Sequence, residues 1–151
     1  MKDPCDDIRD WMYTVLNGTV SYGGAVVPVY SFPPENVSYP YMVIGEHSSE
    51  GEEGAKDRYM MDVATQLHIY TRHTGTDASY LPANTIGNSA LQLLRTRATA
   101  NVYGYDEGPT KMNNFNVIRV RVGAMNTDRI LNDNEIIISK QVSINLLLEE
   151  N

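Results

Sequence analysis

The chain has few of the residues that hold small domains together through covalent bonds or metals. Its 151 residues include a single cysteine, Cys5, and three histidines, so no intrachain disulfide can form. A chain of this length buries about 70% of the surface that its unfolded form exposes, so it needs no cross-link or structural metal to hold a core. A lone thiol also suits a reducing compartment. We therefore expect one domain over residues 1–151.

Basic residues and long apolar runs are also scarce. Twelve Lys and Arg stand against 19 Asp and Glu, which gives a formal net charge of −7. Binding to nucleic acid rests largely on neutralising phosphates, so this composition argues against general nucleic-acid binding. No apolar run approaches the ~20 residues that cross a bilayer. We expect no membrane partner, and we expect any nearby DNA to pass without specific binding.

The sequence lacks the patterns that carry catalysis or hold cofactors. His68 and His73 lie five positions apart on one predicted strand, so they point to opposite faces and share no metal. Cys5 has no neighbouring base in the sequence to activate it. Ser48-Ser49 lacks the Gly-x-Ser-x-Gly elbow, and neither glycine-rich phosphate-binding fingerprint occurs. We expect no enzymatic activity, no cofactor and no metal site.

Two helices are predicted from apolar spacing and from residues typical of helix ends. The first begins near Asp3 and Pro4 and ends at Asn17-Gly18. Its apolar stripe consists of Ile8, Trp11, Met12, Val15 and Leu16. The second begins near Asp77 or Leu81 and runs to about Arg97. Its apolar face consists of Ala83, Ile86, Ala90, Leu93 and Leu94. The following stretch, Ala98 to Asn114, is expected to be irregular.

Six segments are expected to form strands. They are Thr19–Tyr22, Ala25–Tyr30, Tyr41–Gly45, Tyr59–His73, Asn116–Met125 and Glu135–Leu148. Gly23-Gly24 and Asn132-Asp133-Asn134 supply turns between consecutive strands. The expected order is α-β-β-β-β-α-β-β. This order predicts an α+β domain, with a mainly antiparallel sheet and two helices packed on one face.

The predicted strand Tyr59–His73 is longer than the domain that contains it. Fifteen strand residues span about 50 Å at about 3.3 Å each. The expected radius of gyration is only about 15 Å. The strand must therefore bend, end early, or project beyond the body of the domain, where neighbours can reach it.

One acidic segment, Glu46 to Asp57, has no large apolar side chain. Its five acidic residues are Glu46, Glu50, Glu52, Glu53 and Asp57. The pattern does not match an EF-hand calcium loop. We expect a mobile, solvated loop. The functional alternative is a loop that faces a channel or a partner and orders on assembly.

Arginines and tyrosines supply the candidate interface residues. In the segment Asn116–Met125, one face is expected to carry Ile118, Val120, Val122 and Ala124, and the other to carry Val117, Arg119, Arg121 and Gly123. Arg119 and Arg121 then form either a solvated face with cross-strand ion pairs or an interface to an acidic patch. Ten tyrosines against two phenylalanines favour interfaces. Tyr59 and Tyr70, on the long strand, are the candidates.

The order of elements resembles that of tail terminator, or tail completion, proteins of long-tailed bacteriophages. The resemblance covers nearly the whole chain and rests on short core and turn motifs. They are Leu16-Asn17-Gly18, Val27-Pro28-Val29-Tyr30, Pro40-Tyr41-Met42-Val43-Ile44-Gly45, the strand Val63–Tyr70, and the small-residue-rich helix Thr74 to Leu94.

The resemblance implies a homohexameric ring that caps the growing tail tube, ends its polymerisation and docks to the head-side connector. The implied partners are further copies of the chain, the tail tube protein and head-completion or connector proteins. The implied location is the neck of the virion, assembled in the host cytoplasm. Two other functions remain open: another neck protein, such as a head-closure, stopper or connector subunit, and a small-molecule-binding α+β domain.

Overall fold

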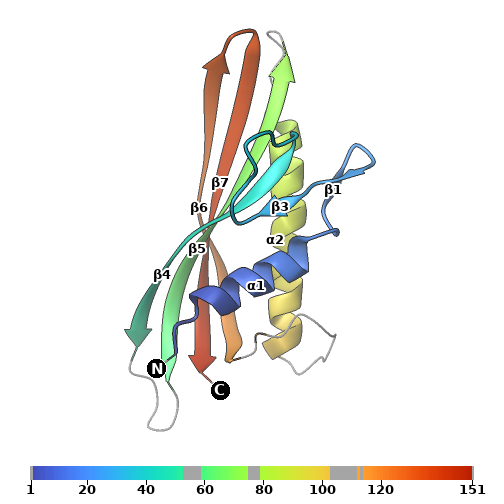
Figure 1. Ribbon diagram of the computed structural model, residues 1–151. Coiled ribbons are helices and arrows are strands. Elements are labelled where there is room, and N and C mark those ends of the chain that lie inside the picture. Colours follow the sequence, from blue (N-terminus) through green and yellow to red (C-terminus); the bar gives the residue numbers. More distant parts are fainter. Residues whose placement is uncertain (1, 53–58, 75–78, 103–111, 113, 151) are drawn as a thin grey trace.

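The structure is a computed structural model that describes residues 2–52, 59–74, 79–102, 112 and 114–150 (Figure 1). The elements in chain order are α1 (Cys5–Leu16), β1 (Ser21–Tyr22), β2 (Ala25–Val26), β3 (Val29–Tyr30), β4 (Tyr41–Glu52), β5 (Met60–Thr74), α2 (Leu81–Val102), β6 (Phe115–Asn132) and β7 (Glu135–Glu150). The described strands form a two-stranded hairpin, β1-β2, and a five-stranded sheet in the order β3-β4-β5-β7-β6. The predicted α+β class is confirmed.

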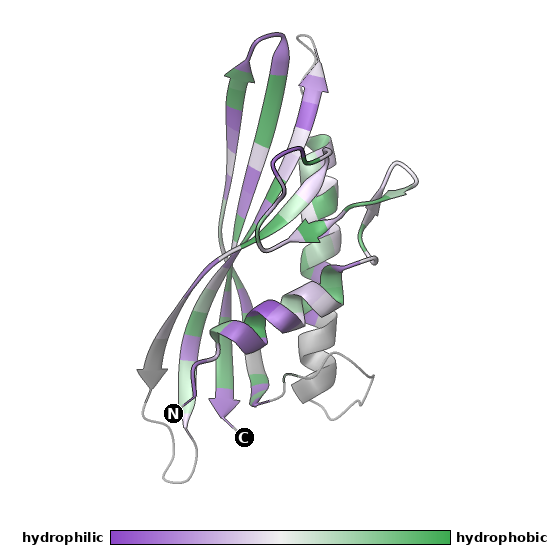
Figure 2. Ribbon diagram, in the orientation of Figure 1, coloured by the Kyte–Doolittle hydropathy of each residue, from purple (hydrophilic) through white to green (hydrophobic). Residues whose placement is uncertain are grey.

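Both helices pack on one face of the large sheet, as expected (Figure 1). Odd-numbered residues of β5 and even-numbered residues of β7 supply that face. The hydroxyl of Thr65 on β5 reaches the sulfur of Met12 on α1 at 3.5 Å. Gly87 on α2 packs against Ile69, also on β5. Figure 2 shows the resulting alternation of hydrophobic and hydrophilic bands along the long strands.

Helix α1 follows the sequence prediction closely. All five residues of its predicted apolar stripe are buried. The N-cap is Pro4 rather than Asp3, but Asp3 Oδ1 accepts a hydrogen bond from the N–H of Cys5 at 2.9 Å. The aspartate therefore satisfies one of the free amides that every helix start presents. Asn17 ends the helix, and Gly18 follows with a φ of 77°.

Helix α2 begins at the later of the two predicted starts and ends later than predicted. The hydroxyl oxygen of Ser79 accepts a hydrogen bond from the N–H of Leu81 at 3.1 Å, and Pro82 lies in the first turn. Proline is tolerated there because its missing N–H would have no helical partner. The helix continues to Val102, so the start of the stretch predicted to be irregular is helical. Residues 103–111 and 113 lie outside the described residues.

The segment predicted as one strand from Ala25 to Tyr30 forms two short strands. β2 pairs antiparallel with β1 around the expected Gly23-Gly24 turn. After Val27 and Pro28 the chain pairs again as β3, parallel to β4. Because proline has no N–H to give to a ladder, a break at this point is expected in physical terms.

The prediction of a solvated loop from Glu46 onward was wrong for its first half. β4 runs through Glu52 and pairs antiparallel with β5 along its length, apart from an irregularity between Ile44 and His47. Pairing with a long neighbouring strand outweighed the low strand propensity of the acidic and glycine residues. Residues 53–58 lie outside the described residues.

The predicted alternation along β6 was also wrong in part. Val117 is fully buried and pairs with Leu148, on the face that also carries Val120 and Val122. A register shift lies between Val117 and Arg119, and a second lies between Val122 and Met125. A bulge adds one residue to a strand and so reverses which side chains face the core.

The sheet projects beyond the helices, which is one of the three outcomes that the length argument left open. β5 occupies Met60–Thr74 as one uninterrupted strand. In Figure 1 the tip of the β6-β7 hairpin extends beyond the end of α2, and the sheet twists strongly along its length. Every residue from Ala124 to Asn134 is exposed. Among the long strands, the exposed part is therefore the outer half of β6 and not β5.

Candidate functional site

The face of the sheet away from the helices carries a row of aromatic rings. Tyr41 on β4 stacks on Tyr70 of β5, with ring centroids 5.0 Å apart and planes inclined by 23°. The ring of His68 stacks on the other side of Tyr70 at 6.3 Å. Tyr39 and Tyr30 meet Tyr41 edge-on, at 5.1 Å and 6.3 Å. The row forms a partly buried aromatic surface whose hydroxyl and ring-nitrogen groups can form hydrogen bonds.

Tyr41 is a packing residue within that row. It is buried, and burial raises the pKa of its phenol to about 12, with smaller contributions from Tyr39 and Tyr70. The phenol is therefore neutral over the whole physiological range. It supplies a hydrogen-bonding edge and ring area rather than a proton acceptor.

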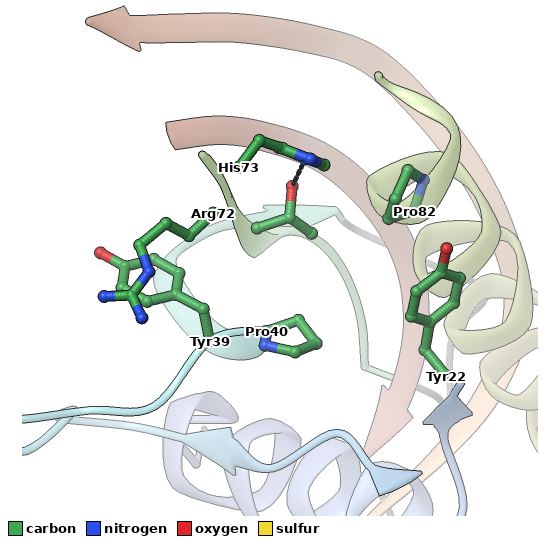
Figure 3. A pocket seen from close by; sticks show the side chains of 7 residues that line it. Tyr22, Tyr39, Pro40, Arg72, His73 and Pro82 are labelled. Carbon is green, nitrogen blue, oxygen red and sulfur yellow. Dashed lines mark hydrogen bonds between the residues drawn. The ribbon is translucent and has the colours of Figure 1, made fainter. Parts of the chain in front are cut away.

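A pocket of about 360 Å³ lies near the row, where β5 ends and α2 begins (Figure 3). Its lining consists of Tyr22, Tyr39, Pro40, Thr71, Arg72, His73 and Pro82. The guanidinium of Arg72 lies over the ring of Tyr39 at 5.2 Å and within 3.9 Å of the Glu135 carboxylate. The Thr71 hydroxyl is 3.2 Å from Nε2 of His73. The volume of this pocket lies near the lower end of the range for ligand pockets.

The two candidate tyrosines lie far apart in the structure. Tyr70 belongs to the aromatic row and is half-buried. Tyr59 is exposed and precedes the other end of β5, where its carbonyl accepts a hydrogen bond from the N–H of Glu150 at 3.0 Å. They therefore do not form one patch.

Arg121 lies on the same sheet face as the aromatic row, but at some distance from it along the sheet. The register places Arg119 opposite Leu147 and Arg121 opposite Asn145. Arg121 is exposed. Tyr70 is opposite Ser139, further along the sheet. Arg121 and the aromatic row thus mark two separate regions of one open face.

Three of the five acidic candidates lie on β4, and the other two lie outside the described residues. Glu46 is exposed on β4, near the bulge, and Glu50 and Glu52 are strand residues opposite Asp62 and Met60. Glu53 and Asp57 lie outside the described residues. The described part of the acidic segment is therefore an edge of the sheet.

His47 was not predicted as a site residue, and the structure gives it the most constrained polar environment near α1. Its Nδ1 is 2.7 Å from the Thr65 hydroxyl, which itself donates to the sulfur of Met12. Nδ1 and the Thr65 hydroxyl therefore share a hydrogen bond. Nε2 is buried and has no hydrogen-bond partner among the described residues. The bulge turns this side chain inward, and no periodicity in the sequence signals it.

We expect the protein to lose stability as the pH falls below about 6.5. Burial, with the nearby charge of Arg9, lowers the pKa of His47, against a small opposing effect of Asp3. Burial also lowers the pKa of His68, against Glu46. The unfolded chain therefore takes up protons first, and each histidine contributes a slope of at most about 1.4 kcal/mol per pH unit.

Urea unfolding between pH 7.5 and 5 measures this slope. His47→Gln removes one titrating group and should flatten the curve relative to wild type. An unchanged slope in His47→Gln would contradict the buried, neutral imidazole.

Cys5 is not an activated nucleophile. Burial raises the pKa of its thiol to about 11, and Asp3 adds to the effect through a hydrogen bond and its charge. The thiol is protonated at neutral pH, whereas reactive cysteines have a lowered pKa. Within the described residues, no cluster of three or more His, Cys, Asp or Glu side chains has a geometry for a metal ion. No helix in the described part of the chain is long and apolar enough to cross a membrane.

Comparison with known proteins finds likeness in structure but not in sequence. No family model and no curated protein matches the chain. A chain in the solved structure described as "Virion of native gene transfer agent (GTA) particle" shares its fold, with a TM-score of 0.60 and 10% sequence identity. The match covers 93% of this chain and 92% of that chain.

Proposed function

We propose that this chain is a structural protein of a phage-like particle rather than an enzyme. Its role is to form a homohexameric ring that caps the tail tube, ends tube polymerisation and joins the tube to the head connector. The observation that carries the proposal is the fold shared, over nearly the full length of both chains, with a virion component of a gene transfer agent. The resemblance to tail terminator proteins makes the role specific.

The geometry supports an assembly role in two ways. The sheet extends past the helices, so part of it has no cover from the described part of the chain (Figure 1). Exposed apolar side chains gather on that part, with Met125, Ile130 and Leu131 each about half exposed or more. Large apolar side chains on a projecting edge favour contact with other chains.

The charge of the chain fits a ring through which DNA passes. With a net charge of −7, the protein repels phosphates overall and does not hold DNA in place. The partners in this role are further copies of the chain, the tail tube protein and head-completion or connector proteins. The location is the neck of the virion, after assembly in the host cytoplasm.

Another neck position, as a head-closure, stopper or connector subunit, is the second candidate. A ring that binds tube protein supports the terminator role, whereas a ring that binds only head-side proteins supports a stopper or connector. The pocket beside Arg72 favours a third function, small-ligand binding, and a monomer with a saturable small ligand would support that.

Light scattering at micromolar concentration and negative-stain imaging test the ring directly. We expect a closed oligomer of six copies, either alone or when tube protein is present, because heterologous contacts that close on themselves give rings. A monomer under both conditions, and in intact particles, would overturn the proposal.

A further inference from the structure

The loop between β3 and β4 carries an aromatic side chain that is almost fully in water. Phe32 is 86% exposed, whereas Phe115, the other phenylalanine of the chain, is 1% exposed. Pro33, Pro34 and Glu35 follow Phe32 and are exposed as well. A large ring beside two proline rings makes an apolar projection on the surface, and a projection of this kind marks a site of contact with a partner.

The backbone of this projection, residues 32–35, has little freedom to lose on binding. The residue before a proline is restricted to extended conformations, and each proline fixes its own φ near −65°. Proline-rich segments bind aromatic-lined grooves at low entropic cost for the same reason. The projection is therefore already shaped for insertion into a pocket with aromatic walls.

The pocket beside Arg72 has walls of that kind. Tyr22 and Tyr39 supply aromatic rings, and Pro40 and Pro82 supply proline rings (Figure 3). Its volume of about 360 Å³ admits a phenylalanine side chain. Aromatic and proline rings are surfaces on which proline-rich segments pack, so the lining matches the chemistry of residues 32–35.

The rim of the pocket offers apolar cover and a cation. Tyr80 and Leu81, which precede Pro82 in the chain, are 46% and 66% exposed. The side chain of Arg72 is 48% exposed, and its contact with the Glu135 carboxylate is long, at 3.9 Å. A guanidinium has five N–H donors, so Arg72 retains donors for a second carboxylate. The rim therefore suits a ligand that combines apolar rings with a negative charge.

The projection does not fill the pocket of its own chain. β3 runs parallel to β4, with Tyr30 opposite Val43, so the chain leaves β3 in the direction in which β4 runs. There the Phe32 ring lies 5.9 Å from the guanidinium carbon of Arg9 on α1. Pro40, which lines the pocket, instead comes before the first residue of β4. The two features thus lie apart, and the pocket of one copy is open to the projection of another.

We propose that residues 32–35 of one copy insert into the pocket of a second copy of this chain. The Phe32 ring packs between Tyr22 and Tyr39, and the Glu35 carboxylate pairs with Arg72. The contact is heterologous, so each copy gives a projection and receives another, and repetition closes a ring. This inference rests on the proposed assembly function and identifies the contact that builds the ring.

Replacing Phe32 with alanine tests the contact without disturbing the core, because the ring is 86% exposed. We expect Phe32→Ala to keep the thermal midpoint of the monomer and to need about tenfold or more protein for half-assembly, measured by light scattering. Phe32→Tyr keeps the ring and is the matched control, with assembly close to that of wild type. Equal assembly of Phe32→Ala and wild type would overturn the contact.

Cross-linking tests which chain receives the projection. In a Cys5→Ser background, Pro33→Cys is mixed with Tyr22→Cys and oxidised, because residues in direct contact lie close enough for a disulfide. We expect linked dimers in the mixture, and none from either variant alone or from Pro33→Cys with Asn145→Cys. A chain that carries both Pro33→Cys and Tyr22→Cys and links within itself would show that the loop folds back, and would overturn the proposal.

The failures are distinguishable. A wild-type ring that forms without the cross-link overturns the contact and leaves the assembly function standing. A Phe32→Ala variant that forms a normal ring but binds tube protein less well would assign the projection to that partner, and would overturn a second copy as the occupant. A wild-type protein that stays monomeric with tube and connector proteins overturns the assembly function, and with it the contact.

Discussion

Replacing Trp11 with alanine should lower the free energy of unfolding by about 3–5 kcal/mol. The side chain is only 3% exposed and belongs to the continuous core that joins α1 to the sheet. Removing it takes away apolar contact area and leaves a cavity that the helix fills only in part. Chemical denaturation followed by circular dichroism measures the change.

The wild-type protein provides a second readout of the same residue. Trp11 is the single tryptophan, so its blue-shifted emission reports burial directly. Trp11→Phe should cost less than Trp11→Ala, because it keeps most of the ring and removes an indole N–H that is buried without a partner among the described residues. Water-like emission together with an unaltered stability of Trp11→Ala would contradict the placement of α1.

Replacing Asn84 with leucine should cost about 2–4 kcal/mol, because it leaves a buried ammonium group without its acceptor. Lys140 is 7% exposed on the helix-facing side of β7, and its Nζ donates to Oδ1 of Asn84 on α2 at 2.7 Å. Gly87, one turn along α2, makes room, since a Cβ there would lie 3.4 Å from Cε of Lys140.

A double-mutant cycle separates the charge from the packing. Lys140→Met keeps the length of the side chain and removes the charge, so it should be close to neutral or stabilising. The double variant, Asn84→Leu with Lys140→Met, should recover most of the loss, because no buried charge remains to be satisfied. Additive losses in urea unfolding would show that the hydrogen bond is not the source of the effect.

The sequence predicted the elements whose signal is local and periodic. The stripe from Ile8 to Leu16, the alternation along β5 and the Gly23-Gly24 turn each depend on neighbouring residues alone. The errors lie where a distant strand decided the outcome. Glu46–Glu52 has the composition of a loop, but β5 offers a long edge for it to pair with. The bulge between Val117 and Arg119 depends on fit to β7 and leaves no simple trace in the sequence.

The candidate site was less accessible to sequence reasoning than the fold. The register of β6 pairs Arg119 with Leu147 and Arg121 with Asn145, and their role at an interface stays a prediction. The aromatic row, the pocket beside Arg72 and the inward His47 each join residues from separate elements, so no spacing along the chain reveals them. The open edge of β6 was invisible for a different reason, since the predicted strand ended at Met125, where the exposed half begins.

The position of β7 in the sheet has a consequence for how the chain folds during synthesis. β7 is the last strand made, yet it lies between β5 and β6, and it pairs with β5 from Met60↔Glu149 to Thr74↔Glu135. Contacts between residues so far apart in the chain close slowly. Until β7 has left the ribosome, β5 has one long edge without the partner that the finished sheet gives it. A new chain is most prone to aggregate in that interval.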